Sequence, residues 1–399
     1  MVKTFKYRLF PSKKTSKLLS KCLEVCRLTY NKMLETKIDL YEKEKKSLSK
    51  FDINNILTKQ KENDEDLKSV HSQIIQNISK RVSLAYDNFF RRVKQGLEKP
   101  GFPRFKAFGR YKSFSFPQNN GSFKIEDNFL KLSKIGNVRI NLHRPLIGDV
   151  KTCTIKKTKT GKWFATFSTD VENNILPENN LEVGIDLGLK TFAVFSDDSI
   201  IKNPRFFIKS EKRLKKIQSK FDKEEKGTLE RRRIGKILCK VHEKVDNQRD
   251  NFCHKISREV INKYQVICIE DLDIKNMLKE KEYLKYSDDP KDRQQYNQEK
   301  QRHKNIHDVS WNKFSSLLVY KAEEAGRQLI KINPENTSKM CSACGKLVPK
   351  ELKDRWHICP KCGLKMDRDK NASINILRLG LESLRRQANA CLAIEAPLL

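Results

Sequence analysis

Four cysteines stand in two closely spaced pairs that could together bind one metal ion. Cys341 and Cys344 lie in CSACG, Cys359 and Cys362 lie in CPKCG, and fourteen residues separate the pairs. This separation is typical of a zinc ribbon, because tetrahedral sulfur ligation suits Zn²⁺. A redox pair or an iron centre is the alternative. We expect a structural site, because four cysteines leave no open coordination position; His357 lies close in sequence but is not needed as a ligand.

Carboxylates in two apolar segments predict a site of a different kind. Asp186 lies in the middle of the apolar run VGIDLG, and Glu270 ends the β-branched run QVICIE. A carboxylate in such surroundings is costly unless it is paired or bound to a metal. The alternative for the second segment is that Glu270, or its neighbour Asp271, caps the turn that follows.

A third acidic position comes directly after the second cysteine pair. Asp367 and Asp369 precede a segment, 374–384, whose apolar residues recur at helical spacing. Either aspartate could be an ordinary N-cap of that helix. Together with Asp186 and Glu270, however, an acid at this helix start completes the ligand set of a two-metal phosphodiesterase. Such a site uses hard oxygen ligands to hold paired Mg²⁺ ions about 4 Å apart.

The elements in the first half of the chain are a strand, helices and a group of short strands. Residues 1–10 alternate apolar and basic side chains and predict a strand that ends at Pro11. Residues 121–172 contain short segments of alternating apolar and polar residues, separated by Gly and Asn turns, and predict a small β-barrel or sheet. Residues 175–180 predict a linker. Two helical stripes lie between and predict a small bundle: Leu19, Cys22, Cys26, Tyr30 and Met33, then Ile75, Ile78, Val82, Ala85 and Phe89.

A basic aromatic segment, residues 96–120, interrupts this pattern with Gly and Pro among Arg, Lys, Phe and Tyr. Such interleaving suits nucleic acid, because cations meet phosphates while rings stack on bases. The equal alternative is that the rings are half-buried strand residues.

The second half of the chain begins a new domain near Leu181. It predicts a β-hairpin turning at residues 188–190, with Asp186 in its first strand. A long basic stretch follows and predicts two or three helices interrupted at Gly227 and Gly235. Because basic residues outnumber acidic ones here, a surface facing nucleic acid is favoured over a merely solvated one.

The formal charge of +33, from 83 basic and 50 acidic residues, predicts a polyanionic partner, with nucleic acid as the first candidate. A Lys-rich composition alone is the alternative, and an anionic membrane fits less well. No apolar run approaches the length of a membrane span and the N-terminus lacks a signal peptide, so we expect a soluble, cytoplasmic protein. The seven other cysteines show no disulfide spacing and predict small buried residues in a reducing compartment: Cys22, Cys26, Cys153, Cys239, Cys253, Cys268 and Cys391.

The order of these motifs resembles a known family. GIDLG, IED, TSKMCSACG with CPKCG, and DRDKNASINI occur in the order found in the TnpB (OrfB) transposon-encoded nucleases, which are relatives of the type V CRISPR effectors. The resemblance covers nearly the whole chain. It implies a guide RNA transcribed from the transposon end and cleavage of double-stranded DNA beside a short transposon-adjacent motif. By position it makes Asp186, Glu270 and Asp369 the RuvC acids and ranks Asp367 second for the third place.

The resemblance also implies a multidomain α+β fold. A wedge β-barrel would comprise residues 1–10 and 98–176, with a helical recognition domain, residues 11–97, inserted in it. A RuvC/RNase H-like α/β nuclease domain would comprise residues 181–340 and 363–385. The zinc ribbon, residues 341–362, would be inserted in that domain, and residues 386–399 would form a C-terminal tail.

These expectations combine into one predicted activity. Asp186, Glu270 and Asp369 would hold two Mg²⁺ ions that serve hydrolysis of DNA, while one Zn²⁺ stabilises the ribbon. The partners would be a guide RNA and double-stranded target DNA, held in a basic channel and bound by a monomer. The alternatives are a nuclease-inactive RNA-guided repressor, which the presence of all three acids disfavours, and a transposase accessory that binds DNA without guide RNA.

Overall fold

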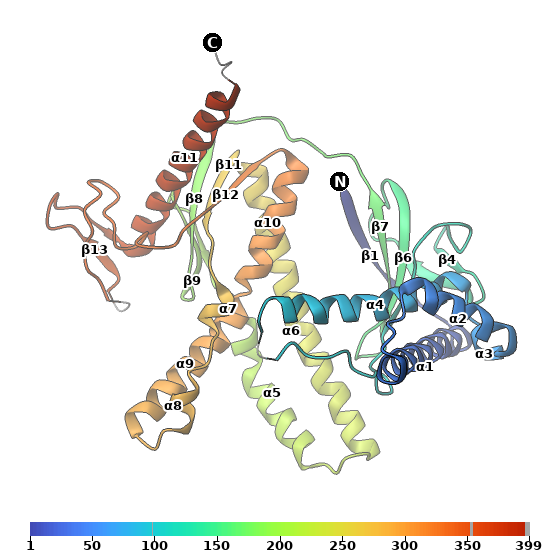
Figure 1. The fold of residues 1–399 in the computed structure, drawn as a ribbon. Helices are drawn as coiled ribbons and strands as arrows, with labels where there is room; N and C mark the ends of the chain where they lie inside the picture. The colour runs from blue at the N-terminus through green and yellow to red at the C-terminus, as the bar shows by residue number, and fades with distance from the viewer. Residues whose placement is uncertain (98, 352–353, 396–399) are drawn as a thin grey trace. The chain divides into compact units, whose positions relative to one another are not determined.

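The computed structural model describes residues 1–97, 99–351 and 354–395 of the chain. These residues form two compact units, Met1–Glu172 and Asn173–Leu399 (Figure 1). Each unit has its own sheet and its own hydrophobic core. Among the described residues, no helix is both long enough and apolar enough to cross a membrane.

The first unit is built on one seven-stranded sheet. Its first strand, β1 (Val2–Phe10), pairs antiparallel with β7 (Trp163–Asp170) and with β5 (Gly136–Asn141). The predicted strand at residues 1–10 is confirmed, because Phe5, Tyr7 and Leu9 alternate into the core. The full order is β2-β6-β7-β1-β5-β4-β3, where the remaining strands are β2 (Ser113–Phe116), β3 (Phe123–Glu126), β4 (Phe129–Leu132) and β6 (Asp149–Lys157).

This sheet curls but does not close into the predicted barrel. Its strand order leaves β2 and β3 as the two edges, and no described strand pairing joins them. The rings of Phe116 in β2 and Phe123 in β3 nevertheless lie 6.0 Å apart, and Phe123 lies 6.1 Å from Phe167 in β7. Side-chain packing thus brings the edges together without backbone hydrogen bonds, so the sheet is a half-barrel.

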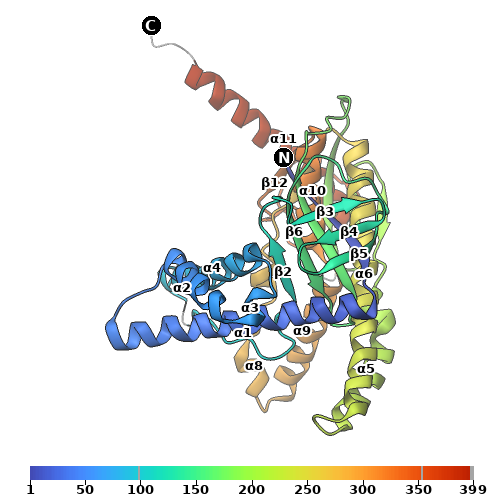
Figure 2. The same ribbon diagram turned by 90° about the vertical axis from the view of Figure 1, so that its right-hand side faces the viewer.

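Helices cover the half-barrel and share its core (Figure 2). They are α1 (Lys13–Glu44), α2 (Lys50–Asn63), α3 (Glu65–Lys68) and α4 (Ser72–Lys94). Ser12 begins α1, because its hydroxyl accepts from the backbone N–H of Thr15, and Ser49 and Asp52 form a capping box at α2. The first predicted stripe is fully buried on α1, whereas on α4 Ala85 and Phe89 are only half-buried.

The second unit is built on a five-stranded sheet of order β10-β9-β8-β11-β12. The predicted hairpin is confirmed: β8 (Glu182–Leu187) pairs antiparallel with β9 (Thr191–Phe195), and Gly188 lies in the turn. In contrast, β8, β11 (Val266–Glu270) and β12 (Gln328–Ile332) run parallel. The remaining strand, β10 (Ile200–Lys202), forms one edge.

The basic stretch after β10 forms two helices, α5 (Phe206–Lys223) and α6 (Leu229–Lys263). Gly227 lies between them with a φ of +97°, so the interruption predicted there is confirmed. The interruption predicted at Gly235 is wrong, because Gly235 lies inside α6. A Cβ added there would lie 3.1 Å from the ring of Phe221 in α5, so this glycine allows the two helices to approach closely.

The two faces of the five-stranded sheet are covered by different helices. Val183, Ile185 and Leu187 point to the core that α6 and α10 (Trp311–Ala325) share. The alternate residues of β8 and β11, including Gly184 and Cys268, face the last helix, α11 (Arg368–Glu395), which lies along β8 in Figure 1. The other elements of the unit are α7 (Ile274–Met277), α8 (Glu282–Tyr286), α9 (Pro290–Val309) and the hairpin of β13 (Trp356–Ile358) with β14 (Lys365–Asp367).

Helix α11 continues well past residue 385, to Glu395, and so runs into the segment expected to be a separate tail. Residues 396–399 lie outside the described part of the chain. Of the cysteines predicted to be small buried residues, Cys22, Cys26, Cys153, Cys253 and Cys268 are buried and Cys239 is half-buried. The side chain of Cys391 lies outside the described residues.

Gly184 and Gly380 allow α11 to lie directly on the sheet. A Cβ on Gly184 would lie 2.1 Å from the carbonyl oxygen of Ser373 and 2.6 Å from the backbone nitrogen of Leu377. A Cβ on Gly380 would lie 2.2 Å from the sulfur of Cys268. The glycines therefore fix the distance at which α11 packs and with it the position of the N-terminal turn of α11.

Replacing Gly184 by Ala is expected to destabilise the second unit by about 3 kcal/mol, because the new methyl group meets backbone atoms that cannot rotate away. Urea unfolding of the full chain measures this change. Gly235→Ala is the matched control, since it meets only a ring edge inside a helix and should change stability by less than about 1 kcal/mol. A Gly184→Ala protein as stable as the control would contradict this account of the packing.

Candidate active site and metal centre

Asp186 and Glu270 lie next to each other at the ends of two neighbouring parallel strands. Ile185 of β8 pairs in register with Ile269 of β11, so Asp186 and Glu270 are the next residues on the two strands. Both point to the α11 face, because Ile185 and Ile269 point to the opposite core. Both side chains are half-buried. The two strands therefore place two carboxylates side by side, as close as adjacent strands allow.

Asp369 joins this pair from the first turn of α11. Its Oδ1 accepts from Nε and Nη2 of Arg368 at 3.2 and 3.1 Å, and its Oδ2 lies 3.7 Å from Nη1 of Arg355. The negative charges of Glu270 and Asp369 both act on Asp186. The structure thus brings together three acids that are distant in sequence.

The site carries excess negative charge in a poorly solvated place. Burial, followed by the charges of Glu270 and Asp369, raises the pKa of Asp186 well above its usual range, although Arg368 opposes the shift. Burial also raises the pKa of Glu270, and the opposing influence is the hydroxyl of Thr337, which donates to its Oε1 at 2.6 Å. A divalent cation would relieve this repulsion, and carboxylate oxygens are the ligands that Mg²⁺ prefers.

The three acids and the cysteine ribbon differ as candidate metal sites. Across residues 1–97, 99–351 and 354–395, the group of three or more His, Cys, Asp or Glu residues placed to hold a metal ion is the four ribbon cysteines, whose ligand atoms lie within 4.8 Å of one another. The three carboxylates therefore fit a divalent metal by type and charge, while Asp369 is engaged by arginines.

Asp186→Asn is expected to stabilise the protein by on the order of 1 kcal/mol near pH 8 in buffer without Mg²⁺. A carboxyl whose folded-state pKa is raised contributes stability below its unfolded pKa and loses it as the pH rises through its folded pKa. The wild type should therefore lose stability from pH 5 to pH 8 more steeply than the variant. Urea unfolding at both pH values measures this, and added Mg²⁺ should favour the wild type. A variant no more stable than the wild type at pH 8 would argue against mutual repulsion.

Asp367 and Asp369 have different surroundings. Asp367 ends β14 and is exposed, and its Oδ1 accepts from the backbone N–H groups of Asp369 at 2.8 Å and Lys370 at 3.3 Å. Asp367 therefore satisfies the first free N–H groups of α11, as an N-cap does. Asp369 is half-buried and its charge acts more strongly on Asp186 than that of Asp367. This geometry favours Asp369 as the third acid of the site.

The four paired cysteines form a compact sulfur cluster. Cys341 Sγ lies 3.6 Å from Cys362 Sγ, and Cys344 Sγ lies 3.5 Å from Cys359 Sγ. Tetrahedral Zn²⁺ with Zn–S bonds of about 2.3 Å requires sulfurs about 3.8 Å apart, so the cluster fits Zn²⁺. The backbone N–H groups of Cys362 and Lys361 lower the pKa of Cys359 to about 6, which favours the thiolate that a metal binds. His357 is buried in β13 and is not part of this cluster.

Two buried asparagines of α11 connect the start of the ribbon to the acids. Asn371 Nδ2 donates to the carbonyl of Met340 at 2.7 Å, and Asn371 Oδ1 accepts from the backbone N–H of Ser342 at 2.9 Å. Asn375 Nδ2 donates to the carbonyls of Thr337 and Met340 at 2.9 and 2.7 Å. Neither these asparagines nor Thr337 stand out as functional residues in the sequence. The i, i+4 spacing of the two asparagines was the available signal, because it places them on one face of the helix.

In the basic aromatic segment, residues 96–120, some rings are buried strand residues and others are exposed, so each of the two interpretations holds for part of it. Phe114 and Phe116 are buried in β2, as strand residues. Phe102, Phe105 and Phe108 are 49%, 54% and 83% exposed. The exposed rings lie among Arg and Lys side chains, so this part of the segment keeps the character of a nucleic-acid-binding surface.

Three family models match the chain. The "Helix-turn-helix domain" model of OrfB_IS605 matches residues 1–46 and the "Probable transposase" model of OrfB_IS605 matches residues 166–281. The "Cas12f1-like, TNB domain" model matches residues 311–376, which include the whole cysteine ribbon and Asp369.

Curated relatives span almost the whole chain. A "Putative RNA-guided DNA endonuclease" of Streptomyces pristinaespiralis is 28% identical over 399 residues, which cover 98% of this chain and 90% of the relative. The "Putative RNA-guided DNA endonuclease InsQ" of Escherichia coli (strain K12) is 26% identical over 384 residues, which cover 95% and 92%. "CRISPR-associated endodeoxyribonuclease Cas12f1" of Sulfoacidibacillus thermotolerans is 25% identical over 248 residues, which cover 56% and 51%.

Solved structures share the fold at low sequence identity. The protein in a Cas12f1–sgRNA–target DNA complex matches with a TM-score of 0.55 and 14% identity over 94% of this chain and 98% of that one. The mini-RNA-guided endonuclease CRISPR-Cas_phi3 matches with a TM-score of 0.51 and 11% identity over 96% and 92%. Fold and site together define a mixed α/β protein in which a half-barrel unit precedes a unit with a mixed five-stranded sheet and a cysteine ribbon. By these family models and relatives, the chain is similar to the TnpB (OrfB) family over nearly its whole length.

Proposed function

We propose that this chain is an RNA-guided DNA endonuclease of a transposon, which cuts guide-complementary double-stranded DNA beside a short transposon-adjacent motif. Relatives that span nearly all of the chain are named as RNA-guided DNA endonucleases. The observation that carries the proposal is the register of β8 and β11, because it sets Asp186 and Glu270 side by side on the face that α11 covers.

We propose that Asp186, Glu270 and Asp369 hold two Mg²⁺ ions in a RuvC-like centre. When bound, the two ions activate water and stabilise the leaving oxygen of the phosphodiester. The protein's own contribution is to orient the oxygens: Thr337 holds Glu270, and Asp367 caps the helix that carries Asp369. Arg368 and Arg355 contact Asp369, so metal binding would require at least one of its oxygens to leave these contacts.

Guide RNA and target DNA are the proposed partners, bound by a monomer. The charge of +33 supports this, because it would neutralise the phosphates of both strands. Base pairing would supply most of the sequence specificity, and the protein would recognise duplex shape and the short flanking motif. We assign the wedge to residues 1–10 and 98–176, and the recognition helices to residues 11–97. The nuclease domain comprises residues 181–340 and 363–385, with the zinc ribbon between them, at residues 341–362.

Sequencing the RNA that co-purifies with the full chain tests this function. A discrete RNA that maps to the 3′ end of the gene is expected. The purified complex should then cut a plasmid library that carries the matching target beside randomised flanks, and the cut members should share a short flanking motif. Absence of a discrete RNA would favour a transposase accessory, and guided binding without cutting would favour a repressor.

Asp369→Ala is expected to lower the cutting rate at least about a hundredfold, equivalent to about 2.7 kcal/mol of barrier, because it removes a proposed metal ligand. Asp367→Ala removes a helix cap and should instead lower stability by about 1 kcal/mol. Single-turnover cutting and urea unfolding measure the two effects. Asp367→Asn is the matched control, since asparagine also caps helices. If Asp367→Ala lost more cutting than Asp369→Ala, the assignment of the third acid would be reversed.

A further inference from the structure

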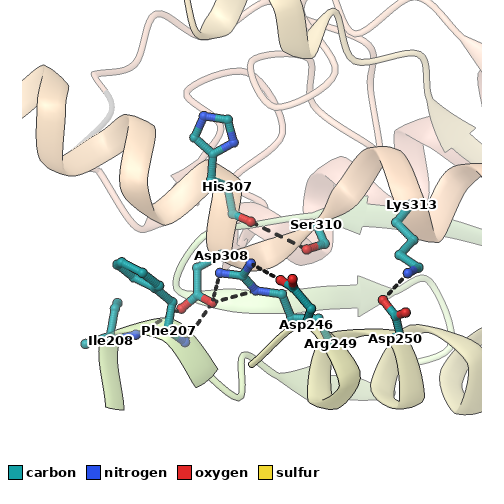
Figure 3. A network of polar contacts seen from close by, with 9 residues as sticks. All are labelled: Phe207, Ile208, Asp246, Arg249, Asp250, His307, Asp308, Ser310 and Lys313. Atoms are coloured by element: carbon teal, nitrogen blue, oxygen red, sulfur yellow. Dashed lines mark hydrogen bonds and ion pairs between the residues drawn. The ribbon is translucent and has the colours of Figure 1, made fainter. Parts of the chain in front are cut away.

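A buried polar joint holds α5, α6 and α9 together (Figure 3). Asp308, near the end of α9, is 5% exposed and accepts from the backbone N–H groups of Phe207 at 2.9 Å and Ile208 at 3.4 Å. Its Oδ1 also accepts from Nε and Nη2 of Arg249 in α6, at 3.1 and 2.9 Å. These four residues are called the Asp308 joint below.

The joint supplies α5 with a cap that its own sequence lacks. Arg205 precedes α5 in a left-handed conformation, with a φ of +51°, and makes no side-chain cap hydrogen bond. The first N–H groups of a helix need an acceptor, and Asp308 provides it from about a hundred residues later in the chain. Burying a carboxylate is costly unless it is paired, and Arg249 pairs it. The start of α5 is therefore fixed from outside the helix.

The start of α5 is in turn connected to the turn that follows Asp186. Asn203 Oδ1 accepts from the backbone N–H of Arg205 at 3.0 Å, and Asn203 Nδ2 donates to the carbonyl of Leu189 at 2.7 Å. Leu189 lies three residues after Asp186, in the turn between β8 and β9. A cavity of about 200 Å³ is lined by Leu189, Asn203 and Asp308 together, so the three meet at one place.

We propose that Asp308 is a positioning residue for the carboxylate site. With Arg249 it fixes the start of α5, and through Asn203 it fixes the turn that holds the end of β8, where Asp186 lies. The inference rests on the proposed function only in that it concerns the same carboxylates. It makes Asp186 dependent on a buried charge pair, Arg249 with Asp308, that is separate from the three carboxylates.

The test compares metal binding by full-length Asp308→Asn and Asn203→Ala with the wild type. Electron paramagnetic resonance measures the Mn²⁺ that binds to the full chain. The bound Mn²⁺ that is lost in Asp186→Ala is assigned to the carboxylate site. Each variant is expected to raise the Mn²⁺ dissociation constant of the site about threefold to tenfold, as the loss of an outer support of a metal ligand does. The double variant should be little worse than either single one, because both act along one path. Wild-type Mn²⁺ affinity in Asp308→Asn would overturn the proposal.

Two further variants separate positioning from stability. Lys313→Met removes the neighbouring ion pair with Asp250, which lies outside the joint, and should leave Mn²⁺ affinity unchanged. Arg249→Met with Asp308→Leu removes both charges, so neither is left buried and unpaired, and the variant should still fold although the cap of α5 is lost. Its Mn²⁺ affinity should remain low, because leucine cannot accept from Phe207 and Ile208; recovery to the wild-type value would overturn the proposal. A chain that never cuts DNA but shows these shifts would refute the proposed function and leave the positioning role standing.

Discussion

Asp186→Ala should abolish guided DNA cutting, with a loss of at least about a thousandfold, equivalent to about 4 kcal/mol of barrier, and leave guided binding within about twofold of the wild type. The charges of Glu270 and Asp369 both act on Asp186, so the substitution removes a proposed ligand that lies near both other acids. Guide RNA and target DNA should still bind, because their contacts depend on the basic surface and on base pairing.

Single-turnover cutting of a matched linear target measures the first effect, and filter binding without Mg²⁺ measures the second. Asp271→Ala is the matched control: this acid adjoins Glu270 in sequence but is exposed and pairs with Lys331 at 3.1 Å. It should cut at close to the wild-type rate. An Asp186→Ala protein that still cuts would place the chemistry elsewhere in the chain.

The positions of Asp186 and Glu270 followed from local sequence because strand periodicity alone determines them. An apolar run interrupted by one acid predicts a buried strand, and alternation then sends the acid to the face opposite the two isoleucines. The cysteine pairs were equally local, since the spacing within each pair and the glycine after it form the knuckle. What the residues could not decide was whether Asp367 or Asp369 faces the strands. That depends on which of them caps α11.

Features that depend on contacts between distant segments could not be predicted. Gly235 resembled a helix breaker, yet it is a site of close approach between α5 and α6, because Phe221 lies against it. The cap of α5 is a residue about a hundred positions away, so no window around residue 206 reveals it. The closure of the first sheet likewise depends on whether its edge strands form hydrogen bonds, and here ring packing alone brings them together.

Removing the ribbon's metal should disable the carboxylate site as well as the ribbon. Cys359→Ser is expected to bind little zinc, to unfold at a temperature about 10 °C or more below the wild type, and to cut at least about tenfold more slowly. The two-stranded hairpin of β13 and β14 has little core of its own, since Trp356 and Ile358 are 58% and 57% exposed. Without metal, a hairpin this small is not expected to stay folded.

Loss of the ribbon's metal should also disturb the three acids, because hydrogen bonds connect the ribbon and the segment before it to α11 and Glu270. Asp367 ends β14 and caps α11, and Thr337, which holds Glu270, is itself held by Asn375. Elemental analysis should find about one Zn²⁺ per wild-type chain. Hydrogen exchange in Cys359→Ser should increase across residues 337–372 rather than within 341–362 alone. Cys239→Ser, at a half-buried cysteine of α6 outside the cluster, should keep the metal and the cutting rate. If exchange rose only inside the ribbon while cutting persisted, the ribbon would be a separate module, and the support of Asp369 would come from the packing of α11 on the sheet at Gly184 and Gly380 alone.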